Sequence, residues 1–370
     1  SQIGVCNRNS DSFFFMKHLE LFAGIGGFRK AMENIQQDFS MPFDCVAFSE
    51  IDANASKTYK ANFDCTGETE MGDIVAFNED MSRYNRLSFS LLTGGFPCQS
   101  FSMMGKKLGF NDHRGTMFFQ IEKIIEYKKP KYVLLENVKN LLTHDKGNTF
   151  KEIIARLQNL GYKVFYDIFN TMDYRLAQKR SRLIIFATTA RLPRSFSFSN
   201  ADVNKVFLEN IHLFHTLLLQ NNVLDVLARQ VKPKYYLSER IKPTLLSDGS
   251  KNFISKSEIN QIIARPLTAT MHKMHRACQD NYYSDGFIQA ENPIAYLNIK
   301  FSKEELALQP IRKLTPQEAF ALQGFPESFV SNAQSKGVCD GALYKQAGNA
   351  VSVNVIYAII YYLFIHNKLK

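Results

Sequence analysis

A single cysteine lies in a loop whose composition favours chemistry over packing. Residues 94–100 read Gly-Gly-Phe-Pro-Cys-Gln-Ser, so two glycines and a proline fix an exposed loop around Cys98. A lone cysteine is usually a small hydrophobic residue, but a buried structural cysteine would not need that loop. A thiolate at the ligand-binding edge of a sheet is a candidate nucleophile. We predict nucleophilic catalysis by Cys98, with a structural cysteine as the alternative.

Charged residues follow at the ends of two further predicted strands. The run Tyr-Val-Leu-Leu-Glu-Asn-Val at 132–138 brings Glu136 to the carboxyl end of a strand, at the same edge as Cys98. Arg180 and Arg182 precede the last predicted strand. Such guanidinium groups are most often solvated surface charge, but here they could hold an anion or a pyrimidine carbonyl. Together these residues predict one catalytic site.

Glycines and acids at successive turns suit a nucleotide-like ligand. The first strand runs into Ala-Gly-Ile-Gly-Gly at 23–27, where an α/β fold brings ligands close to the backbone. The spacing is not G-x-G-x-x-G, so a plain turn between strand and helix is the alternative. Glu50 ends the second strand, where an acid can bind both ribose hydroxyls, and Asp73 follows at the next loop. In this order the two acids predict an adenosine-containing cofactor.

The elements that must position these groups alternate from residue 17 to residue 187. Strands are predicted at 17–22, 43–49, 87–93, 132–136, 163–170 and 182–188, and helices at 27–35, 53–62, 116–128 and 148–160. Short β-rich runs between longer helical patterns are typical of a parallel sheet with crossover helices. We expect an α/β fold with a doubly wound, mostly parallel sheet.

A second, smaller domain is predicted where this alternation stops. The composition changes at 190–202, which is rich in Ser and Pro, and a Leu-rich helical stretch at 203–229 leads into irregular segments. We predict one domain at 1–189 plus 311–370 and another at 190–310.

The C-terminal part contains two more predicted helices. Thr315 and Pro316 have the residue types of an N-cap and a first helical position. The helix at 351–366 is apolar nearly all round, so we expect it to be buried against the first domain.

Charge and composition limit the class of protein. The chain has 45 Lys and Arg against 35 Asp and Glu, a net charge of +10, which favours a polyanionic partner such as nucleic acid. A hydrophobic share of 45% excludes a disordered or fibrous chain.

The six cysteines form no C-x-x-C pair, so we expect no metal, no disulfide framework and a reducing compartment. The start of the chain lacks a signal-peptide pattern, and we expect a cytoplasmic protein without a membrane span.

Six motifs in one order carry a family resemblance. They are Phe-Ala-Gly-Ile-Gly-Gly-Phe at 22–28, Gly-Phe-Pro-Cys-Gln at 95–99, Glu-Asn-Val at 136–138, Gln-Lys-Arg-Ser-Arg at 178–182, Leu-Thr-Pro-Gln-Glu-Ala at 314–319 with Gln-Gly-Phe-Pro at 323–326, and Gly-Asn-Ala-Val at 348–351. This set, over nearly the whole chain, resembles the DNA (cytosine-5)-methyltransferases. The run after Ser100 is more similar to bacterial restriction–modification enzymes than to the related tRNA-modifying branch.

The resemblance implies S-adenosylmethionine as cofactor and S-adenosylhomocysteine as product, with no metal. Phe22 would pack against the adenine, Glu50 would bind the ribose and Asp73 would lie near the adenine amino group. Ile51 stands where some members have an aromatic residue. The full implied cofactor set is Phe22, Gly24, Ile25, Gly26, Gly27, Glu50, Ile51, Asp73, Ile74, Pro97, Asn349, Ala350 and Val351.

The resemblance also implies the reaction. The Cys98 thiolate would add to carbon 6 of a cytosine while Glu136 protonates N3, which makes carbon 5 nucleophilic enough to accept a methyl group. Arg180 and Arg182 would hold the cytosine carbonyl and the catalytic loop. Because a stacked base cannot be attacked from above its plane, the cytosine must be flipped out, and the basic loop at 100–113 would close over it.

Double-stranded DNA is the implied partner, and a cognate restriction endonuclease is implied in function. Target choice is expected at 190–310, and we expect a monomer. The predicted DNA-binding residues are Gln99, Ser100, Lys106, Lys107, Arg114, Arg229, Lys234, Arg265, Thr268, Thr270, Lys273 and Arg276.

Three other functions remain open at this level. A tRNA methyltransferase of the same fold is the nearest, although the long recognition region argues against it. A non-catalytic DNA-binding protein would fit the charge but would leave Cys98, Glu136 and Arg182 without a role. The glycine spacing at 24–27 argues against a nicotinamide oxidoreductase.

Overall fold

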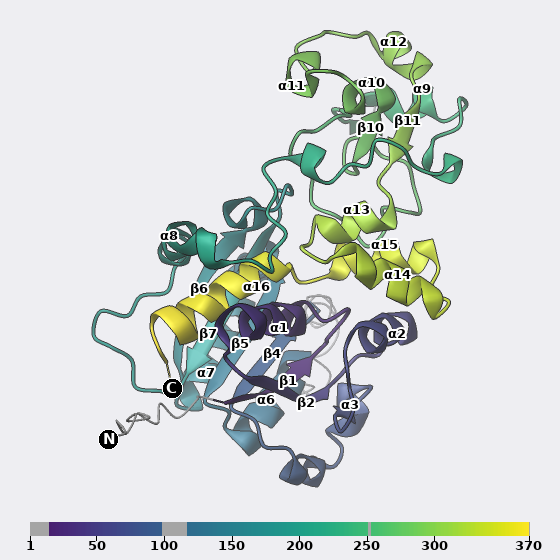
Figure 1. The fold of residues 1–370 in the computed structure, drawn as a ribbon. Coiled ribbons are helices and arrows are strands. Elements are labelled where there is room, and N and C mark those ends of the chain that lie inside the picture. Colours follow the sequence, from purple (N-terminus) through teal and green to yellow (C-terminus); the bar gives the residue numbers. More distant parts are fainter. Residues whose placement is uncertain (1–14, 98–116, 251–252, 370) are drawn as a thin grey trace, which may run out of the picture.

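A seven-stranded sheet forms the body of the larger lobe in the computed structural model, which describes residues 15–97, 117–250 and 253–369 (Figure 1). The strand order is β3-β2-β1-β4-β5-β7-β6. The strands are β1 Met16–Leu21, β2 Phe43–Phe48, β3 Thr69–Glu70, β4 Leu91–Gly95, β5 Tyr132–Val138, β6 Lys163–Asn170 and β7 Ser181–Thr188. Strand β7 pairs antiparallel with both neighbours, and the other pairings are parallel. The predicted mostly parallel α/β fold is confirmed.

Most predicted elements of this lobe are confirmed within a few residues. Helices α1 Gly27–Phe39, α2 Ala53–Asn62, α6 Met117–Lys128 and α7 Asn148–Asn159 follow the predicted order. The fourth strand begins at Leu91 instead of the predicted residue 87. A 3-10 helix ends at Arg86, and Ser90 donates its backbone N–H to Lys17 before the strand starts. The two-residue strand β3 and the short helix α3 Ile74–Phe77 were not predicted.

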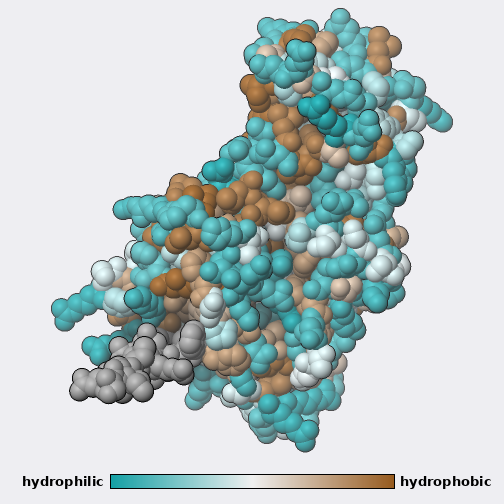
Figure 2. All heavy atoms as spheres, in the orientation of Figure 1, coloured by the Kyte–Doolittle hydropathy of each residue, from teal (hydrophilic) through white to brown (hydrophobic). Residues whose placement is uncertain are grey.

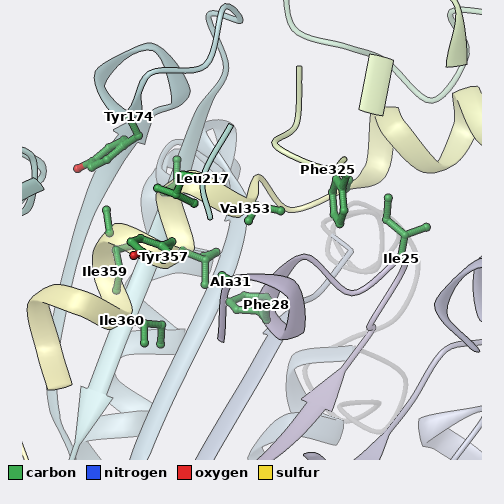
Figure 3. Close-up of a cluster of buried hydrophobic side chains, with 14 of the residues drawn as sticks. Ile25, Phe28, Ala31, Tyr174, Leu217, Phe325, Val353, Tyr357, Ile359 and Ile360 are labelled. Carbon is green, nitrogen blue, oxygen red and sulfur yellow. The ribbon is translucent and has the colours of Figure 1, made fainter. Parts of the chain in front are cut away.

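Helices cover both faces of the sheet. On one face, α1 packs against α16 Val353–Ile360, which continues in a π turn Tyr361–His366 (Figure 3). Phe28 of α1 and Tyr357 of α16 belong to the same buried cluster. On the other face, Phe118 and Ile121 of α6 belong to a second cluster. The prediction that the closing helix is buried against the first domain is confirmed.

Apolar length alone does not make the C-terminal helices a membrane element. Within the described residues, one helical stretch, Asp340–His366, is long and apolar enough to cross a membrane. However, 83% of that window is buried inside the protein, as expected for the core of a folded domain.

The second lobe is built from short elements (Figure 1). These are α9 Lys242–Leu246, β8 Gly249–Ser250, β9 Phe253–Ile254, β10 Tyr282–Ser284, α10 Asp285–Ile288, α11 Pro293–Tyr296, α12 Lys303–Leu308 and β11 Ile311–Lys313. A small buried cluster that includes Leu245, Tyr282 and Ile311 lies within it. Helices α13 Pro316–Ala321, α14 Glu327–Ser335 and α15 Asp340–Asn349 lie between the two lobes in Figure 1.

The predicted long helix at 203–229 is wrong. Helix α8 spans Asn200–Asn210, and the rest of the stretch is 3-10 turns and extended chain. Tertiary hydrogen bonds pin this backbone, because Thr216 donates its hydroxyl to Asp38 of α1 and Gln220 donates its N–H to Arg175. Leu217 and Val223 are nevertheless buried in the larger cluster. Hydrophobic side chains gather at the surface around α8 in Figure 2.

The start of α13 is as predicted. Thr315 is the N-cap, its hydroxyl accepts from the Glu318 N–H, and Glu318 accepts in return from the Thr315 N–H. This capping box satisfies two backbone donors at the helix terminus. Glu318 also pairs with the buried Arg312, which ties α13 to β11.

Candidate active site

A cavity of about 690 Å³ opens at the carboxyl ends of β1, β4 and β5. Ligands of open α/β sheets bind at this edge, outside the carboxyl ends of the strands. Its lining includes residues from both predicted sets, catalytic and cofactor-binding. From these sets it contains Phe22, Gly24, Ile25, Glu50, Ile51, Asp73, Ile74, Pro97, Glu136, Arg180, Arg182, Asn349 and Ala350.

The turn after β1 is fixed by the residues that follow β2. Phe22 and Gly24 both have left-handed backbones, with φ of 52° and 55°. The Gly24 N–H donates to Glu50 Oε2 at 2.7 Å, and the Asp52 N–H donates to Oε1 at 2.7 Å. Both carboxylate oxygens therefore have a fixed direction. The Phe22 N–H donates to the hydroxyl of the buried Ser49 at 3.2 Å.

Gly26 and Gly27 do not line the cavity, and close packing explains why they have no side chain. At φ 84°, a Cβ on Gly26 would lie 2.2 Å from the Phe63 ring. A Cβ on Gly27 would lie 2.3 Å from the Val351 carbonyl oxygen. These glycines let α1 begin directly against α2 and the C-terminal loop, so they shape the cavity indirectly.

Three residues of the predicted cofactor set lie on the next two turns. Asp73 caps α3 and accepts from the Val75 N–H at 2.9 Å, which leaves its other oxygen available. Ile74 is buried beside it, whereas Ile51 is 77% exposed and lines the rim. An apolar side chain that is so exposed contributes little hydrophobic free energy unless a ligand covers it.

Glu136 and Arg182 form an ion pair inside the cavity. The distance from Arg182 Nε to Glu136 Oε1 is 3.0 Å, with side-chain exposures of 22% and 12%. Residue Gly95 stands opposite Glu136 on β4, and the absent side chain keeps space beside Oε2. Burial raises the pKa of Glu136, and the charges of Arg182 and Arg180 oppose that rise. The carboxyl therefore holds its proton more readily than an exposed glutamate would.

The reversed direction of β7 explains how the arginines reach this edge. In a parallel strand the first residues would lie at the opposite end from Glu136. Because β7 is antiparallel, Arg182 stands opposite Val138 at the carboxyl end of β5.

Arg180 is 2% exposed, and backbone oxygens accept most of its hydrogen bonds. Its guanidinium donates to Leu267 at 3.1 Å and to Gly348 and Ala350 at 3.0 Å each. Its Nε is buried without a partner among the described residues. Burial, and then the charge of Arg182, lower its pKa to about 9.

The C-terminal loop closes the cavity from the other side. Asn349 and Ala350 line it, while Val351 packs between Gly27 and Gly95. The predicted residues Cys98, Gln99, Ser100, Lys106, Lys107 and Arg114 lie outside the described residues.

Three of the five predicted DNA-binding cations among the described residues pair with acids of the same chain. Lys234 pairs with Asp340, Arg265 with Glu258 and Arg276 with Asp280. Two predicted threonines are also engaged, because Thr268 donates to Asp280 and Thr270 accepts from Arg276. Arg229 and Lys273 are exposed and pair with no acid among the described residues.

Sequence reasoning missed several residues that line the cavity. They include Ser49, Asp52, Ala269 and Lys345. Asp52 caps α2 and pairs with Lys345 Nζ at 2.5 Å. The pattern of an acid before a helix could have revealed Asp52, but nothing in the sequence indicates that Lys345 or Ala269 would meet it.

Comparison with known proteins identifies the fold and the reaction class together. The family model described as C-5 cytosine-specific DNA methylase matches residues 16–364. The chain belongs to this family. It is a DNA (cytosine-5)-methyltransferase of the Type II restriction–modification group.

Curated relatives of the methyltransferase align over most of its length. It is 38% identical to the Type II methyltransferase M.HaeII of Haemophilus aegyptius over 345 residues, 93% of this chain and 91% of the relative. It is 37% identical to M1.ScrFI of Lactococcus lactis subsp. cremoris over 345 residues, 93% of this chain and 76% of the relative.

Solved structures share the fold of the methyltransferase. The Entamoeba histolytica methyltransferase EhMeth matches with a TM-score of 0.69 and 20% identity, over 95% of this chain and 98% of that chain. The S. pombe Dnmt2 methyltransferase matches with a TM-score of 0.69 and 19% identity, over 95% and 99%.

Proposed function

We propose that this methyltransferase uses S-adenosylmethionine to methylate carbon 5 of a flipped-out cytosine in a specific duplex DNA sequence, through a covalent bond between Cys98 and carbon 6. The observation that carries the proposal is one cavity with two kinds of lining. Phe22, Glu50 and Asp73 stand on one side, and the Glu136–Arg182 pair stands on the other. A reaction between two bound molecules needs both sites to open into one space.

The cavity lining suits an adenosine-containing cofactor. Glu50 has both oxygens oriented by backbone N–H groups, and each oxygen still has a lone pair for a ribose hydroxyl. Asp73 Oδ1 accepts from the helix backbone, so Oδ2 is available to an amino group. The exposed Ile51 and the Phe22 ring offer apolar contacts for a flat base. When bound, S-adenosylmethionine supplies an electrophilic methyl group.

Glu136 would activate the cytosine. Its Oε1 is engaged by Arg182, so Oε2 is the oxygen beside the open space at Gly95. A carboxyl whose pKa is raised by burial can share a proton with N3 of the ring. That proton withdraws electrons from the ring, and the Cys98 sulfur can then form its bond to carbon 6.

The remaining steps return Cys98 and Glu136 to their starting forms. Electrons displaced by the new sulfur–carbon bond reach carbon 5, which would bond to the methyl group as the bond from that methyl group to the sulfonium breaks and S-adenosylhomocysteine leaves. A base removes the hydrogen of carbon 5, the bond from Cys98 to carbon 6 breaks, and the N3 proton returns to Glu136. Cys98 thus leaves as a thiolate, ready for another turnover.

A duplex with 5-fluorocytosine at the target position tests the covalent step. Fluorine cannot leave carbon 5 as hydrogen does, so the Cys98 adduct should persist after methylation and survive denaturation. We expect a stable protein–DNA band with wild-type enzyme and none with Cys98→Ser. Wild-type enzyme that methylates ordinary DNA yet forms no such band would contradict the adduct.

A further inference from the structure

A buried glutamine joins the catalytic strand to the segment that carries predicted DNA contacts. Gln178 lies two residues before Arg180 and is fully buried. Its side-chain oxygen accepts from the Leu267 N–H at 2.9 Å. Its amide nitrogen donates to the Leu322 carbonyl at 3.0 Å and to Gln323 Oε1 at 3.2 Å. One side chain therefore connects three regions of the chain.

The segment of residues 264–269, here called the recognition segment, is held by both backbone polar groups of Leu267, which belong to two successive peptide units. Gln178 accepts from the Leu267 N–H, and Arg180 donates to the Leu267 carbonyl at 3.1 Å. Backbone bonds extend the contact, because Ala264 donates to Ala177 and Lys179 donates to Ala264. The recognition segment thus lies along the entry to β7 in a fixed register.

The end of the recognition segment is part of the active-site wall. Ala269 lines the same cavity as Glu136 and Arg182. Gly348, directly before the cavity-lining Asn349, has no side chain where the segment passes, and a Cβ there would lie 2.2 Å from the Thr268 carbonyl carbon. Leaving this position empty lets the two backbones touch. A shift of the segment would therefore move one wall of the cavity.

The chain beyond the recognition segment leads directly to the exposed Lys273. Only three residues separate it from Ala269. A movement of Lys273 when it contacts DNA would therefore also move Ala269 in the cavity. Buried amides that are fully paired hold such geometry firmly, because any unpaired partner would lose its hydrogen bond in the core.

We infer that Gln178 is a positioning residue that couples DNA sequence discrimination to methyl transfer by fixing the recognition segment against the active site. The inference rests on the proposed function. Gln178 itself lies outside the cavity lining, so it acts through Leu267 and Ala269.

The chain offers a matched control for a buried glutamine. Gln220 is 5% exposed, its side-chain oxygen accepts from the Ala177 N–H at 2.8 Å, and its amide donates to the Ala321 carbonyl at 2.7 Å. Its two partners, Ala177 and Ala321, are the chain neighbours of Gln178 and of Leu322, to which Gln178 donates. However, the Gln220 side chain makes no hydrogen bond to the recognition segment. Loss of either amide should cost similar stability, but only Gln178 should affect discrimination.

The experiment compares wild type, Gln178→Met and Gln220→Met on unmethylated plasmid DNA. Bisulfite sequencing over time gives the ratio of methylation rates at the target sequence and at sequences that differ by one base. For Gln178→Met we expect this ratio to fall by about ten-fold, close to the value of one mismatched base pair. For Gln220→Met we expect the wild-type ratio with a similar loss of melting temperature.

Gly348→Ala tests the same segment from its other side, so a poorly folded Gln178 variant does not end the experiment. Its added carbon should push residues 268 and 269 away and also lower the ratio. An unchanged ratio in both the Gln178 and Gly348 variants, or an equal fall in the Gln220 variant, would overturn the inference. Absence of methylation by wild-type enzyme would instead refute the proposed function.

Discussion

The active-site end of the sheet and the second lobe position their side chains in different ways. Glu136 and Gly95 lie on strands of seven and five residues inside the central sheet, and register alone sets them opposite each other. The second lobe has strands of two or three residues and helices of four to six. Its geometry depends on side-chain bonds such as those of Gln178 to Leu267.

This difference indicates which parts of the protein can change in sequence without loss of the reaction. A rigid sheet edge suits chemistry that is common to a family, whereas loops on a rigid scaffold can change partner specificity without changing the fold. Substitutions at the sheet edge should therefore affect the rate of methyl transfer. Substitutions in the second lobe should affect affinity or sequence choice.

Replacement of Cys98 by serine gives the largest expected effect. A hydroxyl is a much weaker nucleophile than a thiolate, so methyl transfer should fall by about 10³-fold or more. Transfer of labelled methyl groups to duplex DNA measures the rate, and gel retardation should show nearly unchanged DNA binding. A Cys98→Ser variant that keeps turnover would exclude covalent catalysis by this residue.

Glu136→Gln should be the next most damaging change. The amide keeps the shape but cannot cycle a proton to N3, so kcat should fall by about 10²- to 10⁴-fold. Asp73→Asn is the matched comparison from the cofactor side, where we expect a raised KM for S-adenosylmethionine and a nearly unchanged kcat. If both variants lowered kcat equally, the two sides of the cavity would not have the separate catalytic and cofactor-binding roles proposed here.

Arg182→Met should shift the pH dependence of the reaction. The active Glu136 holds a proton, so kcat/KM should fall as pH rises through its pKa. Removing the positive charge that opposes the raised pKa should move this fall to higher pH and lower the plateau. Arg156→Met is the control, because Arg156 pairs with Glu122 and Glu152 on α6 and α7. If kcat/KM falls at the same pH in both variants, Arg182 does not influence the pKa of Glu136.

Single charge removals in the recognition region should have the smallest effects. Arg229→Ala and Lys273→Ala should each weaken binding to all DNA sequences and reduce the slope of log K against log salt by about 1. Lys163→Ala, at the first residue of β6, should leave the slope unchanged. A slope that stays constant in the first two variants would place the DNA elsewhere on the surface.

Sequence reasoning recovered the sheet because its strands are short apolar runs with clear breaks. It located Glu136 and Glu50 because each follows such a run, and Asp73 because it lies in the loop Gly-Asp-Ile at 72–74. It failed at 203–229, where apolar residues are buried by loops that tertiary hydrogen bonds hold in place. It also missed Ala269, because a neutral residue far along the chain reaches the cavity only through the bonds of Leu267 to Gln178 and Arg180.

The glycines at 23–27 also show that contacts between distant parts of the chain cannot be predicted from a local motif. The run at 23–27 predicted a ligand-binding turn, and Gly24 does line the cavity. Gly26 and Gly27 instead accommodate Phe63 and Val351, which are close only in the folded chain. A motif thus indicates that small residues are needed, while the fold decides whether a ligand or another backbone needs the space.

The most direct test of the account is bisulfite sequencing of unmethylated duplex plasmid DNA after incubation with purified protein and S-adenosylmethionine. We predict protected cytosines confined to one short recurring sequence, and no protection with Cys98→Ser. Full conversion of every cytosine by wild-type protein that binds S-adenosylmethionine would contradict methyl transfer to DNA by this active site.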